Sequence, residues 1–131
     1  MNEALAKEVI ERSREAAIKE GVAVCITVVD ESGLLAAFLR MKDAIPGAID
    51  VSLKKARTAA LFRKDSADIG SRAQPGGPIY TLEATNGGLI SFGSGVMIKD
   101  QNGKVIGSVG ISGASVEQDQ AIAMIGANMG L

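Results

Sequence analysis

Apolar and polar positions follow helical and strand periods in turn along the first half of the chain. Apolar residues recur at helical spacing over residues 3–20, with charged residues between them, which predicts an amphipathic helix. The β-branched run "VAVCITVVD" (22–30) predicts a buried strand, and "LLAAFLRM" (34–41) predicts its hairpin partner across the turn "DESG". Small apolar residues then recur at helical spacing and predict a second helix from about 48 to 63.

The second half begins with a polar, turn-rich segment over residues 63–88, which holds two Gly-Gly pairs. We interpret it as a long surface excursion with short helical turns, and such excursions are often functional or interfacial. "LISF" (89–92) predicts a short strand. "GSGVMIKD" (93–100) and "VIGSVGIS" (105–112) predict a hairpin through Asn102-Gly103.

The last predicted element is a helix over residues 117–129. Ser115 stands just before this helix and Gln118 stands in its first turn. Their spacing is that of a capping box, in which each side chain bonds to the backbone N–H of the other residue. Four residues mark its mostly apolar face: Ala121, Met124, Ile125 and Asn128.

Hairpins rather than strand–helix–strand units predict an antiparallel sheet with helices packed on it. We therefore expect an α+β sandwich with N-terminal, middle and C-terminal helices. The length of 131 residues fits a single domain over 1–131.

Composition and charge narrow the classes of partner. The formal net charge is −1 and aromatic residues make up only 3%, so neither a basic field nor stacking platforms predict nucleic-acid binding. No stretch approaches the roughly 18 apolar residues of a membrane span. The charged N-terminal segment does not resemble a signal peptide, and a cytoplasmic or otherwise reducing compartment is expected.

The chain has no histidine, and this absence excludes several classes of catalytic and metal site. Without it, Ser-His-Asp triads, Cys-His pairs and His-ligated zinc sites are excluded. With one cysteine, thiolate zinc and iron–sulfur clusters are excluded as well. That cysteine, Cys25, stands in an apolar run and is predicted to be a buried structural thiol.

The stretch "GKVIGSVGISGASVEQD" (103–119) raises the question of a phosphate-binding loop. Its glycines at 107, 110 and 113 are spaced by three, which fits neither the dinucleotide fingerprint nor a Walker loop. We interpret it as a strand running into a capped helix. The glycines then permit close approach of a backbone or helix, or else of a ligand or partner.

A basic run, "KKARTAALFRK" (54–64), lies on the predicted middle helix. Such a run is most often a solvated face. Alternatively, Lys55 and Thr58 hold an anionic group such as a carboxylate or propionate.

Two long stretches are informative together: "VVDESGLLAAFLRMKDAIPGAIDVSLKKARTAALF" and "GVMIKDQNGKVIGSVGISGASVEQDQAIAMIGA". They resemble the GlcG/HbpS family, which includes the C-terminal domain of PduO-type cobalamin adenosyltransferases. The positions that match the family pattern are Asp30, Gly33, Arg40, Met41, Ala44, Lys55, Ala56, Thr58 and Ala59, then Gly103, Ile106, Gly107, Gly110, Ser112, Gly113 and Asp119.

The resemblance implies a profilin-like sandwich with a sheet of about five strands, which forms homo-oligomers. Some members bind haem or iron, or contribute to haem breakdown and redox sensing. Their histidine ligands have no counterpart here, so no haem ligand carries over. Tyr80, Cys25 or a methionine are the iron ligands that this sequence offers.

We therefore expect an accessory protein that binds a small or anionic ligand, with haem or another tetrapyrrole as a candidate, rather than an enzyme. A haem-degrading or redox-sensing factor and a structural partner in a diol- or glycolate-utilisation assembly remain alternatives. No catalytic or metal-ligating residues are predicted. The predicted ligand-binding residues are Arg40, Lys55, Thr58, Gly107, Gly110, Ser112 and Gly113.

Overall fold

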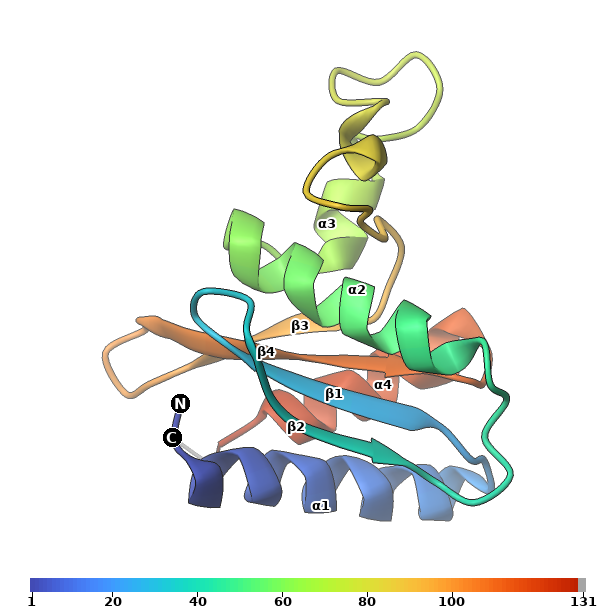
Figure 1. The fold of residues 1–131 in the computed structure, drawn as a ribbon, viewed down its shortest axis with the longest axis vertical. Helices are drawn as coiled ribbons and strands as arrows, with labels where there is room; N and C mark the ends of the chain where they lie inside the picture. Colours follow the sequence, from blue (N-terminus) through green and yellow to red (C-terminus); the bar gives the residue numbers. More distant parts are fainter. Residues whose placement is uncertain (130–131) are drawn as a thin grey trace.

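A computed structural model describes residues 1–129 and contains one antiparallel sheet with helices on both faces (Figure 1). The elements, in chain order, are α1 (Glu3–Glu20), β1 (Cys25–Asp30), β2 (Leu35–Arg40), α2 (Ala48–Phe62), α3 (Ser66–Gly70), the 3-10 turn η1 (Leu82–Ala84), β3 (Gly95–Lys99), β4 (Val105–Ser112) and α4 (Val116–Ala127). The predicted α+β class is confirmed, and residues 130–131 of the predicted domain lie outside the described range.

The sheet has the order β2-β1-β4-β3, and every neighbouring pair is antiparallel. The hairpins β1-β2 and β3-β4 are those predicted from the sequence. They join through the central pair β1-β4, in which Thr27 lies opposite Gly110. The two central strands, β1 and β4, therefore come from different hairpins and are far apart in sequence. Each hairpin also supplies one edge strand, β2 or β3.

The fifth strand predicted at residues 89–92 is absent from the described structure. The backbone N–H groups there bond to side chains instead of to a strand. Ile90 donates to Thr58 Oγ1 (3.1 Å) and Ser91 donates to Glu83 Oε2 (2.8 Å). The sheet therefore has four strands rather than about five.

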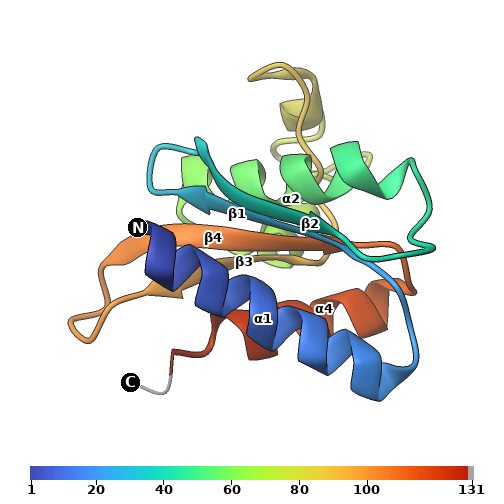
Figure 2. The ribbon, with the colours of Figure 1, turned by 60° about the horizontal axis from the view of Figure 1, so that its bottom comes forward.

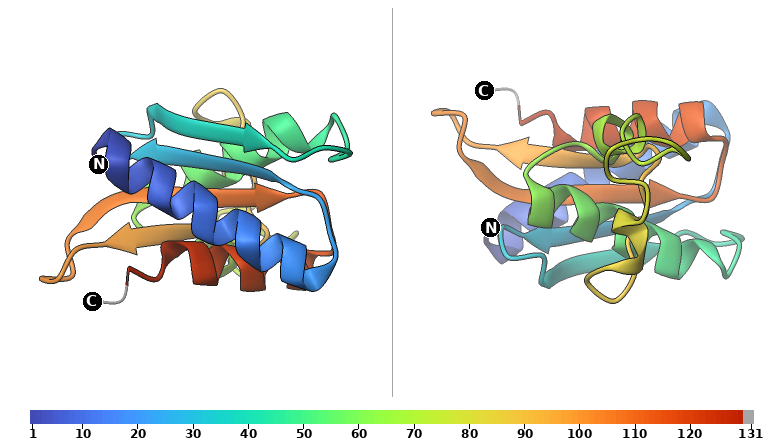
Figure 3. Two further views of the ribbon diagram at one scale, coloured as in Figure 1. Left: turned by 90° about the horizontal axis from the view of Figure 1, so that it is seen from below. Right: turned by 90° about the horizontal axis from the view of Figure 1, so that it is seen from above.

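The two faces of the sheet differ in chemistry. On one face α1 and α4 lie side by side (Figures 2 and 3). Branched apolar residues of the strands, including Ile26, Ile98 and Ile111, pack against them. The other face carries small and polar residues such as Thr27 and Ser108, and α2 covers it. The excursion between α2 and β3 projects beyond α2, away from the sheet (Figure 1).

Both terminal helices begin as their sequences predict, but α4 turns a different face inward. Asn2 caps α1, and Ser115 with Gln118 forms the predicted capping box of α4. The expected apolar face of α4 is wrong, because Met124 and Ile125 are more than half exposed. The buried residues are Asp119, Ile122, Ala123 and Gly126. At Gly126 no side chain fits because α1 approaches closely, with Ser13 against this glycine.

Two strand glycines let α2 rest directly on the sheet. A Cβ at Gly110 would collide with the carbonyl oxygen of Ser52, and one at Gly95 would collide with that of Lys55. Hydrogen bonds hold the helix at this depth, since Thr27 Oγ1 bonds to Ser52 Oγ (2.8 Å) and Ser108 Oγ donates to the carbonyl of Ala56. At Gly110, the prediction that a glycine of the 103–119 stretch permits close helix approach is confirmed.

No helix of the described residues is long and apolar enough to cross a membrane.

The contact between α2 and the sheet yields a stability prediction. Gly110→Ala forces α2 off the sheet, and we expect it to lower the free energy of unfolding by about 1–3 kcal/mol or more. Urea unfolding followed by circular dichroism measures this change. The matched control is Gly47→Ala, where an added methyl group meets nothing within 4 Å. Equal unfolding midpoints for the two variants would contradict the prediction.

Candidate functional site

The seven predicted ligand-binding residues do not gather on one open surface. Arg40 is exposed at the end of β2, where its Nε donates to the carbonyl of Ala44 (3.2 Å). Lys55 and Thr58 are buried on α2, and Gly110 lies beneath that helix. Gly107 lies toward the other end of β4, where a Cβ would meet the carbonyl oxygen of Val29. Whether any of the seven binds a ligand stays a prediction.

Two of them, Lys55 and Gly113, contact one buried carboxylate, that of Asp119 in the first turn of α4. Lys55 forms an ion pair with it across 3.6 Å, and the backbone N–H groups of Gly113 and Ala114 donate to it. Ser112 is the last residue of β4, just before this turn. Asp119 was matched to the family pattern by sequence but was not predicted to be a site residue.

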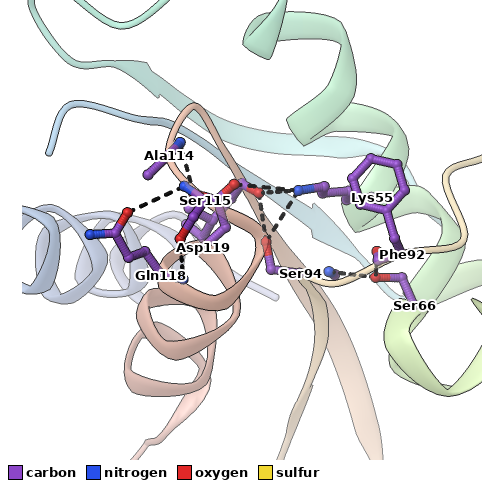
Figure 4. A network of polar contacts seen from close by, with 10 residues as sticks. Lys55, Ser66, Phe92, Ser94, Ala114, Ser115, Gln118 and Asp119 are labelled. Carbon is purple, nitrogen blue, oxygen red and sulfur yellow. Dashed lines mark hydrogen bonds and ion pairs between the residues drawn. The ribbon is translucent and has the colours of Figure 1, made fainter.

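Lys55 is the largest fully buried side chain, at 1% exposure. Its ammonium donates to the carbonyl oxygen of Ile111 (2.9 Å) and to Ser94 Oγ (3.5 Å), in addition to its ion pair (Figure 4). The ammonium also lies 4.9 Å from the centroid of the Phe92 ring, a cation–π distance. The interpretation of the basic run as a solvated face is therefore wrong for this lysine, whose three donors all have partners.

Burial dominates the electrostatics of this pair. Desolvation lowers the pKa of Lys55, although the neighbouring Asp119 charge acts in the opposite direction. Desolvation likewise raises the pKa of Asp119, although Lys55 and the backbone donors oppose the shift. Because the pair is enclosed and its partners belong to the protein, it ties α2 to the corner between β4 and α4. No bound substrate is needed to satisfy it.

Thr58 has a comparable tying role. Its hydroxyl donates to the carbonyl of Lys54 (2.7 Å) and accepts the N–H of Ile90 (3.1 Å). It therefore holds the segment leading into β3 against α2. The two residues singled out as holders of an anionic group thus have protein partners in this structure.

An apolar cleft of about 210 Å³ lies in the excursion, which the sequence marked as functional or interfacial. Its lining residues come from the end of α2, from α3 and from the turn before β3. They are Phe62, Ile69, Ile79 and Leu82, joined by the basic residues Lys64 and Arg72. An apolar wall with two cations suits an amphiphilic anion. No periodic pattern could identify the cleft, because irregular backbone brings its residues together.

A second hollow, of about 300 Å³, lies between β3 and the end of α4 and has polar walls. Its two carboxylates already serve the backbone. Asp65 accepts the N–H of Met97, and Asp100 accepts two N–H groups of its own turn. Within residues 1–129, no group of three or more His, Cys, Asp and Glu side chains is arranged to hold a metal ion. The apolar cleft is therefore the better candidate for a ligand.

Cys25 is fully buried, as its sequence context predicts. Burial raises the pKa of its thiol, and the nearby Arg40 charge only partly offsets this. The thiolate form that would bind a metal is thus disfavoured, and the sulfur does not reach solvent.

The buried pair generates a prediction about stability. Lys55→Met leaves the Asp119 carboxylate buried without its cation, and we expect a loss of about 3–5 kcal/mol in unfolding free energy. Adding Asp119→Asn to this variant should recover part of the loss. Guanidinium unfolding of the single and double variants measures the coupling. If the two single effects simply added in the double variant, the pair would not be coupled.

Comparisons with known proteins match nearly the whole chain. A family model described as "Haem degrading protein HbpS-like" matches residues 1–128. An uncharacterized 15.0 kDa protein from the dhaT-dhaS intergenic region of Citrobacter freundii is 40% identical over 121 residues, which cover 92% of this chain and 84% of that protein.

Two solved structures are similar over 97% of this chain. Protein ORFY of Klebsiella pneumoniae has a TM-score of 0.92 at 36% identity, with 88% of its own chain covered. A structure named as a PduOC:heme complex has a TM-score of 0.91 at 31% identity, with 92% of its own chain covered. The family model and these relatives together show that the chain belongs to the HbpS-like family.

Proposed function

We propose that this chain is an accessory protein that binds an amphiphilic anion of the haem or tetrapyrrole type in the apolar cleft of the excursion. The observation that carries the proposal is the lining of that cleft, which combines apolar side chains with Lys64 and Arg72. Family membership and the heme complex named for PduOC support the class of ligand.

The lining fits such a ligand chemically. The apolar wall offers contact to the hydrocarbon face of a macrocycle, and the two cations offer charge-assisted hydrogen bonds to carboxylates at its edge. The cleft, at about 210 Å³, is smaller than most ligand pockets, which have about 300–1,000 Å³. It would therefore hold one edge of a macrocycle and leave the remainder outside.

An iron ligand is restricted to few residues. The chain has no histidine, and Cys25 is buried. Tyr80 is more than half exposed and follows Ile79, which lines the cleft. We take its phenolic oxygen as the candidate ligand, because a tyrosinate is an established axial ligand of haem iron. When bound, haem would supply an iron centre for ligand or redox chemistry, and the cleft residues would position it.

Arg40 offers a second, separate cation for an anionic group. It lies at the end of β2 rather than in the excursion. Of the predicted ligand-binding residues it is the one whose side chain is exposed and charged. Its contribution is therefore tested beside that of the cleft. Action as a homo-oligomer and a cytoplasmic location likewise stay proposals.

Hemin titration followed by the Soret band tests the site. We expect saturable binding by the unmodified protein, and a weakening of about tenfold or more for Arg72→Glu, because it places a negative charge beside the ligand carboxylates. The matched control is Lys7→Glu, the same charge change on the exposed surface of α1. No saturable shift at micromolar hemin would refute the proposal. A loss of affinity in Arg40→Ala but not in Arg72→Glu would move the site to β2.

The iron ligand is tested by the spectrum rather than by affinity. Tyr80→Phe should shift the Soret and charge-transfer bands of the complex, because it removes the phenolic oxygen. Cys25→Ser should leave them unchanged, because the sulfur is buried. Unchanged spectra in Tyr80→Phe would reject tyrosine as the ligand. Iron-free protoporphyrin is the comparison ligand for the affinity of the cleft, because it has no iron and binds through the cleft contacts alone.

A further inference from the structure

Four apolar side chains from three segments surround the cleft of the excursion. Ile69 of α3 is the most buried of them, at 3% exposure. Phe62 ends α2, and Ile79 and Leu82 belong to the turn before β3; all three are half-buried. Their side chains border a space of about 210 Å³. The cleft is therefore an apolar slot between irregular segments and the end of one helix.

Hydrogen bonds within the chain shape this slot. The N–H of Ile79 donates to the carbonyl of Arg72 (3.1 Å), and the N–H of Leu82 donates to the carbonyl of Ile79 (3.0 Å). At the base of the excursion, Ser66 Oγ donates to the carbonyl of Phe92 (2.7 Å), which ties α3 to the segment before β3. Because the protein's own contacts form the slot, little backbone has to be ordered when a ligand enters.

The charges that line the cleft have one sign. Lys64 and Arg72 are both exposed, and within residues 1–129 neither side chain forms an ion pair or a hydrogen bond. Three acidic residues adjoin lining residues in sequence, namely Asp65, Asp68 and Glu83, but none of them lines the described cleft. Asp65 and Glu83 accept backbone N–H groups elsewhere. The cleft thus offers two uncommitted cations to an anion.

The volume of the cleft selects a slender ligand. An apolar cavity of about 150 Å³ holds benzene, with its six carbons, so a cleft of about 210 Å³ has room in proportion for about eight carbons. An unbranched chain of that length can be enclosed, whereas a macrocycle can insert only an edge. A small hydrophilic anion would lose hydration against the apolar wall without burying apolar surface of its own.

We propose that the cleft binds a medium-chain acyl carboxylate, a fatty acid of about eight carbons. Its chain lies among the four apolar side chains, and its carboxylate lies at the mouth against Lys64 and Arg72. This ligand occupies the cleft of the proposed function but does not depend on tetrapyrrole binding. If hemin also inserts there, the two ligands compete.

Calorimetric titration of the full, unmodified chain with fatty acids of increasing length tests the chain site. Each methylene that enters the cleft should raise the affinity about fourfold from hexanoate through heptanoate to octanoate. The gain should level off at decanoate, whose last carbons stay outside. No saturable binding of octanoate below about 1 mM, or an affinity that does not rise with chain length, would overturn the proposal.

Two ligands with the same chain test the charge. Octan-1-ol has no charge and octyltrimethylammonium has the opposite one, and both should bind more weakly than octanoate. Lys64→Gln combined with Arg72→Gln should reduce the preference for octanoate over octan-1-ol by about three- to twentyfold. The matched control removes two exposed cations of α1, through Lys7→Gln with Lys19→Gln, and should keep that preference. An unchanged preference in the cleft variant would overturn the proposal.

A variant within the slot tests where the chain lies. Ile79→Trp should fill part of the space and make hexanoate bind as tightly as octanoate or more tightly. Octanoate still favoured as in the unmodified protein would overturn the placement. If this variant fails to fold, the length series on the unmodified chain still decides. A peptide ending in leucine that binds more tightly than octanoate would assign the cleft to a protein partner and overturn the proposal.

Hemin titration separates this inference from the proposed function. Octanoate binding without hemin binding would refute the tetrapyrrole proposal and support this one. Hemin binding without octanoate binding would do the reverse. If both bind in the cleft, octanoate should raise the apparent dissociation constant of hemin in proportion to its own occupancy.

Discussion

The seating of α2 on a small and polar sheet face is the constraint on which the rest of this structure depends. Gly95 and Gly110 remove the side chains that would hold the helix away, and Lys55 extends from it to the carbonyl of Ile111 and the carboxylate of Asp119. A buried lysine is costly unless its charge and all its donors are satisfied. The depth of α2 and the position of α4 are therefore coupled, because Asp119 belongs to the first turn of α4.

This seating also decides what the molecule leaves exposed. Because α2 lies over β4 and β1, it cannot cover β2 as well, and the apolar residues of that edge remain at the surface. The chain that leaves α2 must return to β3 from outside the sheet. It does so through the excursion, and Thr58 of α2 and Ser66 of α3 bond to the backbone of the segment that returns to β3. The cleft with Lys64 and Arg72 and the uncovered β2 edge are thus two consequences of one packing arrangement.

Much of the fold could be predicted from local pattern. The helix over 3–20, both hairpins and the capping box of Ser115 and Gln118 rest on interactions between residues near in sequence, so period and turn chemistry identify them. The segment 89–92 has the composition of a strand, yet its N–H groups bond to Thr58 and Glu83. On α4, apolar character did not identify the buried face, because α1 lies so close that its Ser13 leaves no room for a side chain at Gly126.

The candidate site was the least predictable part. Lys55 stands in a basic run, for which the sequence predicted either a solvated face or, at Lys55 and Thr58, a site for an anionic group, because nothing local shows that the anion is a carboxylate of the same chain. Its burial follows from contacts with Ile111 of β4 and Asp119 of α4, which are both more than 50 residues away along the chain. The sequence by itself determined most of the element types, the class of fold and the family, since these depend on local periodicity and on motifs. Only the tertiary structure decided which cation is buried, where the cleft forms and which strand α2 leaves uncovered, because each depends on surfaces brought together from distant segments.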